Sequence, residues 1–577
     1  MAQKLMLGNE AVAEGLREAG CRFVSSYPGT PSTEITEYVE RQKAIYCEWA
    51  PNEKVAVEGA VGAAFAGARA FSAMKHVGFN VAADPIFTAA YTGVNGGLVI
   101  AVADDPGCHS SQNEQDSRHY ARAAKLPMLE PSDAEECRTF TKLAFELSEQ
   151  YDIPVLLRLS TRISHTRSMA NIEPPAETAL RGYEKNAAKY VMVPAAARPR
   201  HEDLEKRMAA LSAWCETAQI NTVEWGTSRK IGVISSGISY QTAREALGED
   251  VSYVKLGIVY PLPVQPLREL AETVDEIWVI EELDDFIESH CLKHGIKVKG
   301  KCKLSPLGEY TAAQIREAVL GVTEKTASAA AVPVRPPVLC PGCPHRGLFH
   351  VVNKMKLTVM GDIGCYTLGA APPLSAMDAC VCMGASVSSL HGFITARPEY
   401  APRSVAVIGD STFMHSGVTG LMNIVYNQSP ATVLILDNSI TGMTGHQENP
   451  GSGRTLMGKP SPILDLEALC RAVGVKRVRT VDPHELEAVE SALREELAAA
   501  EVSVIIARRP CVLLKSVPKQ KPLTVDKAAC KNCGMCLKIG CPALQKGEKC
   551  VSVDSTLCVG CGLCARMCRF GALIREE

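Results

Sequence analysis

Three kinds of segment are missing from this sequence of 577 residues. No apolar run is long enough to cross a bilayer, so we expect no membrane-spanning helix. No basic stretch suggests a nucleic-acid partner, and a net charge of −3 indicates no particular partner. The first residues mix Glu and Asn with apolar residues and lack the continuous apolar stretch of a signal peptide. We therefore expect the start of a folded domain in a cytoplasmic protein.

Cysteine, in contrast, is abundant, with 23 in the chain. Without a secretion signal these thiols should stay reduced, so their density indicates metal binding and argues against disulfides. Seven of them stand alone in predicted helices or strands, and we expect most of these to be small buried apolar residues. The seven are Cys21, Cys47, Cys137, Cys215, Cys291, Cys302 and Cys470.

Apolar strands rich in Val, Ile and Leu alternate with helices through most of the chain, which predicts α/β domains with parallel sheets covered on both faces. A less regular segment is expected near residues 166–228. The expected organisation is a first α/β domain (residues 1–170), a connecting segment with a smaller α/β domain (171–327), an Ala/Pro-rich linker (328–338), a third α/β domain (339–515), a second linker (516–525) and a cysteine-rich domain (526–577).

The C-terminal domain contains two cysteine repeats. Three thiolates at two-residue intervals wrap one corner of an iron–sulfur cube, and the fourth ligand comes from the other repeat, as in bacterial two-cluster ferredoxins. The alternative is a zinc ribbon, but the triple spacing occurs twice and favours two [4Fe–4S] clusters. The repeats depart from the usual pattern in the four residues before Cys541 and in Arg569, which replaces a proline. Cys550 is not expected to be a ligand. The predicted quartets are Cys530, Cys533, Cys536 and Cys568 for the first cluster, and Cys541, Cys558, Cys561 and Cys564 for the second.

Two apolar strands end in polar residues that are typical of a thiamine diphosphate site. Gly409 and Asp410 end one strand, and Asn438 ends the next, 28 residues after Asp410. We expect a loop and a helix between them. Asp410, Asn438 and the backbone carbonyl of Ile440 would hold Mg²⁺, which takes oxygen ligands, against the diphosphate. The alternative is ordinary turn chemistry at strand ends.

Thiamine chemistry also requires a carboxylate that protonates the aminopyrimidine of the cofactor. Glu53 is our candidate, because it opens an Ala- and Gly-rich helix that a cofactor can approach closely. Glu58 competes with it but lies five residues further on, on a different side of the helix. The alternative for either residue is a solvated charge near a helix N-terminus.

Together these residues resemble the 2-oxoacid:ferredoxin oxidoreductases, and most closely the large subunits of the indolepyruvate type. The resemblance covers essentially the whole chain. Besides the cysteine repeats it rests on SYPGTPSTEI from Ser26, NEKVAVEGAVGAAFAGARA from Asn52, MKHVGFNVAADP from Met74, ADDPGCHSSQNEQDSR from Ala103, LCPGCPHRG from Leu339, GDIGCYTLG from Gly361 and GDSTFMHSG from Gly409.

The resemblance implies two parallel-sheet domains of the thiamine-diphosphate-binding type. The first is of the pyrimidine-binding type and the later one binds diphosphate and Mg²⁺. A transketolase C-terminal-like α/β domain lies between them in the chain, and a two-cluster ferredoxin-like domain follows. It implies that Glu53 and Thr30 are catalytic, with Thr30 near the substrate carboxylate and the cofactor. The implied cofactor-binding residues are Gly364, Tyr366, Met383, Gly384, Gly409, Asp410, Ser411 and Asn438.

Substrate residues are also suggested by the resemblance. Gly29 replaces a bulkier residue of pyruvate-specific members and would leave room for an aromatic substrate, a hypothesis that Gly29→Ile tests. His76 and Arg118 lie in family-like segments that would line the pocket. Their alternative is a solvated polar loop, which also applies to Lys75, His109 and Gln112.

A third cluster is implied by the resemblance alone. Its ligands would be Cys340, Cys343, Cys365 and Cys511. The alternatives are structural zinc or unused thiols, since these cysteines are far apart in the sequence. Cys380 and Cys382 have the wrong spacing for a cluster corner, and we expect them to pack or to line the cofactor.

The implied activity is oxidative decarboxylation of aryl pyruvates (indolepyruvate, phenylpyruvate and hydroxyphenylpyruvate) to acyl-CoA and CO₂. Electrons would leave through the clusters to an external ferredoxin, so the enzyme would be oxygen-sensitive. A smaller beta subunit and an (αβ)₂ assembly are also implied. The alternatives are a related oxidoreductase for another 2-oxoacid, a non-oxidative thiamine-dependent arylpyruvate decarboxylase, and an electron-transfer subunit with a vestigial thiamine fold.

Overall fold

The computed structural model describes residues 2–176, 178–323, 333 and 336–575, which separate into two compact units, Met1–Ala330 and Ala331–Glu577. Most of the predicted linker 328–338 lies outside the described residues. Within the described ranges, no helix combines the length and apolar character needed to cross a bilayer. Of the seven solitary cysteines, only Cys302 is exposed, and the others are buried as predicted.

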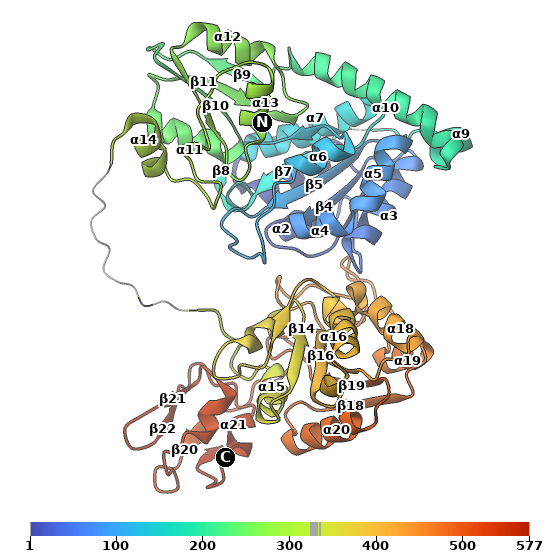
Figure 1. Ribbon diagram of the computed structural model, residues 1–577, viewed down its shortest axis with the longest axis vertical. Coiled ribbons are helices and arrows are strands. Elements are labelled where there is room, and N and C mark those ends of the chain that lie inside the picture. The colour runs from blue at the N-terminus through green and yellow to red at the C-terminus, as the bar shows by residue number, and fades with distance from the viewer. Residues whose placement is uncertain (1, 177, 324–332, 334–335, 576–577) are drawn as a thin grey trace. The chain divides into compact units, whose positions relative to one another are not determined.

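A seven-stranded sheet forms the centre of the first unit (Figure 1). All of its strand pairs are parallel except that of β12 with β6. Every residue of β4, β5 and β7 is buried, as expected for continuous apolar strands covered on both faces. In order across the sheet the strands are β12 (Ile258–Tyr260), β6 (Met128–Leu129), β7 (Val155–Ser160), β5 (Leu98–Asp104), β4 (Ala70–Lys75), β2 (Phe23–Ser26) and β3 (Tyr46–Trp49).

Short helices follow the strands and cover this sheet. Helix α1 packs on α7, and the first strand of the chain pairs antiparallel with β8 to close the domain. The elements are β1 (Ala2–Leu7), α1 (Gly8–Glu18), α2 (Thr33–Gln42), α3 (Glu53–Phe65), α4 (His76–Val81), α5 (Ala83–Thr92), α6 (Arg118–Ala124), α7 (Ala134–Tyr151), α8 (Thr161–His165) and β8 (Arg167–Ile172).

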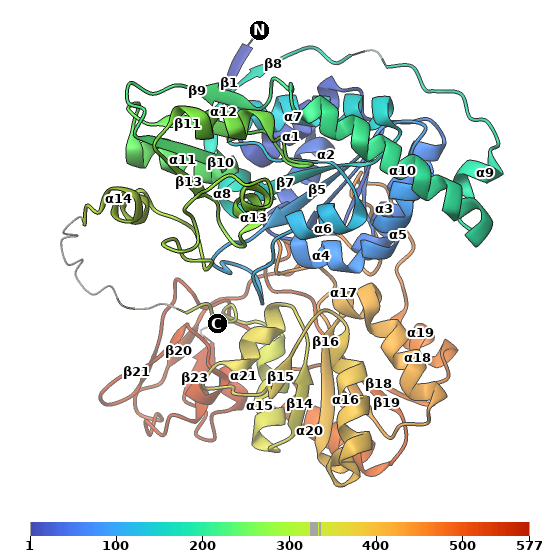
Figure 2. The same cartoon turned by 45° about the horizontal axis from the view of Figure 1, so that its top comes forward.

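The segment near residues 166–228 is more regular than we predicted. After β8 and the short helix α9 (Ala187–Tyr190) it forms the 22-residue helix α10 (Pro194–Cys215). Leu204, Met208 and Leu211 of α10 join the core of the seven-stranded sheet, and Figures 1 and 2 show α10 beside α5. The helix escaped prediction because these residues, although at helical spacing, occur only from its middle onward, and the Ala-, Pro- and Arg-rich first turns leave the whole segment weakly amphipathic.

The middle α/β domain also belongs to the first unit. Its sheet has apolar clusters on both faces, one around Leu256 and Leu267 and the other around Tyr253 and Ile315. In sheet order the strands are β13 (Glu276–Ile280), β10 (Ile231–Ser236), β11 (Ser252–Leu256) and β9 (Thr222–Glu224), with helices α11 (Gly237–Leu247), α12 (Gln265–Thr273), α13 (Phe286–Lys293) and α14 (Ala312–Leu320).

The second unit is built on a six-stranded, all-parallel sheet with an apolar core on each face. In sheet order the strands are β15 (Ala379–Cys380), β14 (Thr358–Gly361), β16 (Ser404–Gly409), β17 (Thr432–Asp437), β19 (Ser503–Arg508) and β18 (Arg477–Val481). The covering elements are α15 (His345–Lys354), η1 (Cys365–Ala370), α16 (Ala385–Ala396), η2 (Pro398–Arg403), α19 (Leu466–Ala472) and α20 (Leu486–Ala498).

The chain after β16 differs from our expectation of a loop and a helix. It turns directly into helix α17 (Asp410–Thr412), continues as the π-helical turn η3 (Phe413–Gly417) and ends as α18 (Val418–Tyr426). Gly417 allows this close packing, since a Cβ there would lie 2.6 Å from Ile408 Cδ1. A π-turn inside a helix is uncommon and is frequent at functional sites.

The C-terminal domain is a small two-repeat fold in which each half contributes little secondary structure. Its strands are β20 (Leu523–Val525) paired with β23 (Leu573–Arg575) and β21 (Leu544–Lys546) paired with β22 (Val551–Val553), and its helices are η4 (Met535–Ile539) and α21 (Leu563–Arg566). Figure 1 shows it beside α15 of the parallel-sheet domain, with which η4 is in contact.

Candidate functional site

Glu53 occupies the first turn of α3 and is 5% exposed. The Asn52 side chain caps the helix by accepting a hydrogen bond from Val55 N at 2.9 Å, which fixes where the helix begins. Gly78 of α4 faces Glu53 so closely that a Cβ at this position would lie 2.5 Å from Glu53 Oε1. Glu58, the competing candidate, is exposed and pairs with Lys54. Glu53 is thus the buried carboxylate of this helix.

Thr30 and Gly29 lie at the carboxyl edge of the first sheet beside Lys75, the last residue of β4. Ser110 connects them, since its Oγ donates to the Thr30 carbonyl at 3.4 Å and accepts from Lys75 Nζ at 3.1 Å. Asp105 lies 3.8 Å from the same ammonium. Burial lowers the pKa of Lys75 to about 8. A buried cation therefore adjoins the predicted substrate residue, although we expected Lys75 in a loop.

His76 begins α4 and is almost fully buried, and neither of its ring nitrogens has a hydrogen-bond partner among the described residues. A buried polar side chain without a partner usually faces water or a ligand. His76 therefore stays a candidate substrate residue.

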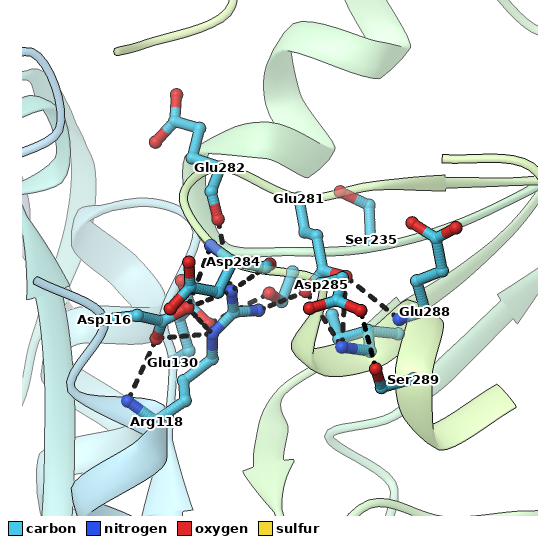
Figure 3. A network of polar contacts seen from close by, with 12 residues as sticks. Asp116, Arg118, Glu130, Ser235, Glu281, Glu282, Asp284, Asp285, Glu288 and Ser289 are labelled. Carbon is cyan, nitrogen blue, oxygen red and sulfur yellow. Dashed lines mark hydrogen bonds and ion pairs between the residues drawn. The ribbon is translucent and has the colours of Figure 1, made fainter. Parts of the chain in front are cut away.

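The predicted substrate residue Arg118 is buried and ion-paired in the structure. Its side chain is 1% exposed and forms ion pairs of 2.6 Å with Asp116 and 2.5 Å with Glu281 of the middle domain (Figure 3). Glu281 in turn accepts hydrogen bonds from the first backbone N–H groups of α13. Arg118 therefore connects two domains of the first unit, and its substrate role stays a prediction.

Asp410 and Asn438 follow adjacent strands, β16 and β17, at the carboxyl edge of the second sheet. Asp410 is buried, and its Oδ2 has no hydrogen-bond partner among the described residues. Burial, followed by repulsion from Asp437, raises the pKa of Asp410 to about 8. A buried carboxylate with an unsatisfied oxygen is the environment that a bound cation would correct.

The Asn438 amide completes a cation-type donor set. One of its terminal atoms lies 2.8 Å from the Ile440 carbonyl oxygen and 3.2 Å from Asp410 Oδ1. If that atom is the amide oxygen, three oxygens converge without a proton between them, which a hard cation satisfies. If it is the nitrogen, it donates to both neighbours. Ser411 and Thr441 hydroxyls meet at 2.9 Å beside the same strand ends. These residues fit Mg²⁺.

Asp362 is a residue that our sequence reasoning missed. Its buried carboxylate accepts hydrogen bonds from Gly384 N at 2.9 Å and Ser386 N at 3.0 Å, and so fixes the turn that starts α16. Gly384 is required there because it has a φ of 85° and a Cβ would lie 2.6 Å from Ser416 Oγ. That hydroxyl donates to the Met383 carbonyl at 3.0 Å. The signal was present, because Asp362 follows a glycine at a strand end as Asp410 does.

Gly364, Tyr366 and Gly409 pack against one another below this turn. A Cβ on Gly364 or Gly409 would lie within 2.6 Å of the Tyr366 ring, and the Tyr366 hydroxyl donates to the Ile363 carbonyl at 2.9 Å. Their role in the structure is therefore to shape the backbone around the strand ends that hold the oxygen set.

The cysteines of the implied third cluster lie within electrostatic range of one another. Burial, followed by repulsion from Cys340 and Cys511, raises the pKa of Cys365 to about 11. Burial raises the pKa of Cys343 to about 12, and Cys340 and Cys365 add to it. The fold thus gathers four thiols that are widely separated in the sequence. Cys380 and Cys382 are exposed within the described part of the chain.

The C-terminal cysteines gather as the interleaved repeats predict. One cavity is lined by four thiols that include one from the first repeat and three from the second, namely Cys541, Cys558, Cys561 and Cys564. Around Cys536, burial and then Cys568, Cys533 and Cys530 raise its pKa. Backbone N–H groups of Ala572 and Leu523 donate to the sulfur atoms of Cys568 at 3.3 Å and Cys558 at 3.5 Å. Hydrogen bonds of this kind tune cluster potentials.

Comparison with known proteins agrees with this geometry. A family model described as the C-terminal TPP-binding domain of thiamine pyrophosphate enzymes matches residues 362–507. The thiamine-diphosphate-binding model of pyruvate flavodoxin/ferredoxin oxidoreductases matches residues 14–218, and a 4Fe-4S binding domain matches residues 551–574.

Curated relatives match along nearly the whole chain. Indolepyruvate oxidoreductase subunit IorA of Methanothermobacter marburgensis is 40% identical, with 98% of this chain and 96% of that protein covered. The chain belongs to the IorA family of indolepyruvate oxidoreductase subunits. The IorA proteins of Archaeoglobus fulgidus and Pyrococcus horikoshii are each 38% identical, covering 94% and 98% of this chain and 93% and 96% of their own length.

Membership of the IorA family confirms the predicted fold class, with two thiamine-diphosphate-type domains, an intervening α/β domain and a ferredoxin-like domain. This chain is accordingly an oxidoreductase subunit of a thiamine diphosphate and 4Fe–4S enzyme.

Proposed function

We propose that this chain, with a smaller second subunit, catalyses the CoA-dependent oxidative decarboxylation of aryl pyruvates. The 2-oxoacid anion and CoA give acyl-CoA, CO₂ and one proton, and two electrons pass one at a time to ferredoxin. Indolepyruvate is the first substrate we expect, since the relatives are named indolepyruvate oxidoreductase subunits. Phenylpyruvate and hydroxyphenylpyruvate share its aromatic side chain.

The observation that carries this proposal is the nearness of thiols to the oxygen set within the second unit. A Cβ on Gly442 would lie 3.5 Å from Cys365 Sγ and 3.6 Å from Asn438 Nδ2, so the two lie around the same glycine. A non-oxidative decarboxylase needs no electron acceptor there. A proximal [4Fe–4S] cluster on Cys340, Cys343, Cys365 and Cys511, followed by two in the C-terminal domain, would accept electrons in single steps.

Thiamine diphosphate, when bound, supplies the carbon nucleophile that adds to the 2-keto group and retains the electrons released with CO₂. Asp410, Asn438 and the Ile440 carbonyl would hold Mg²⁺. Glu53 would hold a proton at N1′ of the aminopyrimidine. Thr30 would orient the substrate carboxylate, and Gly364, Tyr366, Met383, Gly384, Gly409 and Ser411 would shape the diphosphate site.

Gly29 supports the aryl preference through its contact with Lys75. A Cβ at Gly29 would lie 3.3 Å from Lys75 Cβ, so a large side chain there must displace the lysine or enter the neighbouring space. Gly29→Ile should abolish phenylpyruvate turnover. Unchanged turnover would contradict this part of the proposal.

The assembly that we propose is an (αβ)₂ complex that donates electrons to an external ferredoxin. Its test is an anaerobic assay of the co-expressed complex that follows ferredoxin reduction with indolepyruvate or pyruvate, with and without CoA. We expect CoA-dependent reduction that is faster with indolepyruvate. CO₂ and aldehyde without ferredoxin reduction would establish the decarboxylase instead.

A matched pair of variants tests the catalytic carboxylate. Glu53→Gln should slow ferredoxin reduction by at least about 100-fold, which is the effect expected when an acid–base group is lost. Glu58→Gln, on an exposed position of the same helix, should leave the rate within about twofold, because its charge partner is the solvent-exposed Lys54. Equal losses in both variants would remove Glu53 from its proposed role.

A further inference from the structure

Arg346 lies in the first turn of α15 and is 2% exposed, which makes it one of the most deeply buried cations of the chain. Its guanidinium donates to four backbone carbonyls from two segments. Nε donates to Cys340 O at 3.0 Å and one Nη donates to Leu339 O. The other Nη donates to Ile539 O at 3.0 Å and to Gly540 O at 2.6 Å.

These four carbonyls belong to two different cysteine motifs. Cys340 begins the Cys340–Cys343 loop of the proposed proximal cluster, and Ile539 and Gly540 directly precede Cys541 of the C-terminal domain. Gly540 has a φ of 64°, and a Cβ there would lie 3.3 Å from an Arg346 Nη. A larger residue would therefore push against the guanidinium. Arg346 connects the two motifs through their backbones.

Arg346 also forms part of the wall of the cavity that is lined by Cys541, Cys558, Cys561 and Cys564. Pro341 and Gly342, from the loop between Cys340 and Cys343, line the same cavity. The loop of one quartet thus covers the site of another, with the guanidinium between them. Arg346 therefore borders the space between the proximal quartet and this one.

The charge of Arg346 has no carboxylate partner at ion-pair distance among the described residues. Its neighbours are instead the two cysteine motifs, since it donates to Cys340 O and lines the cavity of Cys541 and Cys561. A buried cation without a counter-ion is costly. Thiolates that hold a [4Fe–4S] core supply negative charge, and that charge grows by one when the core is reduced.

We propose that Arg346 is a positioning residue of electron transfer. It fixes the Cys340–Cys343 loop against the C-terminal domain and raises the reduction potential of the cluster held by Cys541, Cys558, Cys561 and Cys564. The inference rests on the proposed cluster ligation. A fixed positive charge favours the reduced, more negative cluster, and the low dielectric of the interior strengthens this effect. The planar fork of arginine also satisfies four carbonyls, whereas a lysine ammonium with three donors would keep the charge and leave one carbonyl without a donor.

The test uses the co-expressed, anaerobically purified complex with the substitutions Arg346→Gln and Arg346→Lys. Iron and sulfide per chain are measured first, and reduction potentials are then determined by EPR-monitored titration. We expect Arg346→Gln to keep its iron and to make reduction of one cluster at least tenfold less favourable, a fall of 59 mV for a one-electron couple. Arg346→Lys should stay near the parent potential, because it keeps the charge.

The control is Arg566→Gln, which removes an exposed cation from the same C-terminal domain. Arg566 pairs with Glu485 and is 49% exposed, so solvent screens it and the potentials should stay unchanged. Coinciding potentials of Arg346→Gln and parent would overturn the inference. The inference would also be overturned if the reduction potential fell as far in Arg346→Lys as in Arg346→Gln, or if both variants lost iron. Lysine retains the positive charge, so neither result could come from loss of charge. Absence of iron from the parent complex would instead refute the proposed cluster ligation.

Discussion

Two buried arginines, Arg118 and Arg346, each lie where two domains of one unit meet, and their partners differ in kind. Arg118 faces the carboxylates of Asp116 and Glu281. Although burial disfavours its charge, these carboxylates hold the pKa of Arg118 well above its ordinary range. Arg346 faces carbonyls and thiols, and burial lowers its pKa. Side chains of the protein thus neutralise the charge of Arg118, whereas we expect a bound cluster to neutralise that of Arg346.

Asp410 extends the comparison to the opposite sign. Its carboxylate is buried without a cationic side chain at ion-pair distance in the described part of the chain, and burial raises its pKa to about 8. In the first unit Asp104 is equally buried but meets Arg158 at 2.8 Å. At Asp410 and Arg346, uncompensated buried charge therefore marks positions where an ion or cluster is expected, whereas the compensated charges of Arg118 and Asp104 belong to structural ion pairs.

The largest effect is expected when the ion pairs of Arg118 are removed. Arg118→Met would leave Glu281 buried without its cation and Asp116 with only Arg158, 3.9 Å away, and breaking a buried pair costs about 3–5 kcal/mol. We expect that loss in the unfolding free energy of the first unit, measured by calorimetry of the complex. Arg122→Met is the control, since Arg122 lies over the same Phe286 ring but is exposed. A loss below about 1 kcal/mol in Arg118→Met would contradict the structural role.

Glu282 tests the pH dependence of the same junction (Figure 3). Burial raises its pKa from 4.5 to about 7. The folded protein therefore binds this proton more tightly than the unfolded chain, so the contribution of Glu282 to stability falls as pH rises from about 4.5 to 7. Glu282→Gln keeps an acceptor for Tyr310 N–H and should stabilise the protein at pH 8 on the order of 3 kcal/mol, with no gain at pH 4.

The measurement for Glu282 is thermal unfolding of parent and variant between pH 4 and pH 8. Glu205→Gln is the control, since Glu205 pairs with Lys125 near the surface of the same unit and its loss should not produce this window. A Glu282→Gln gain that is the same at every pH would show that titration of Glu282 is not its cause.

The uncompensated Asp410 predicts stabilisation by metal. Mg²⁺ with thiamine diphosphate should stabilise the second unit by about 2.7 kcal/mol when the free ligand is 100-fold above its Kd. Asp410→Asn should lose most of this gain, because it removes the anionic oxygen. Asp482→Asn, which removes a carboxylate paired with Arg509 elsewhere in the unit, should retain it. Thermal unfolding with and without the ligands measures this stabilisation. If Asp410→Asn is stabilised as much as the parent, Asp410 does not belong to the metal site.

The sequence predicted the parts of this comparison that depend on local spacing. The cysteine repeats and the strand-end residues Asp410 and Asn438 follow from short patterns, so their grouping could be anticipated. The partners of Arg118 and Arg346 could not, because Glu281 and Ile539 lie 163 and 193 residues away from them. The local pattern around Arg118 could not reveal its ion pairs, because a polar residue near Gly- and Ser-rich loops looks the same whether it faces substrate or a distant carboxylate.

The smallest effect is expected for Arg566, which lies at the same domain boundary as Arg346. Arg566 forms a bidentate pair with Glu485 at 2.5 and 2.6 Å, but both side chains are about half exposed. Arg566→Gln should therefore cost at most about 1 kcal/mol, and the cost should vanish in high salt. A double-mutant cycle with Glu485→Gln, followed by thermal unfolding at two salt concentrations, measures the pair. A coupling energy that persists in high salt would show that solvent ions do not screen this pair. Burial would then not be what separates the environment of Arg346 from that of Arg566.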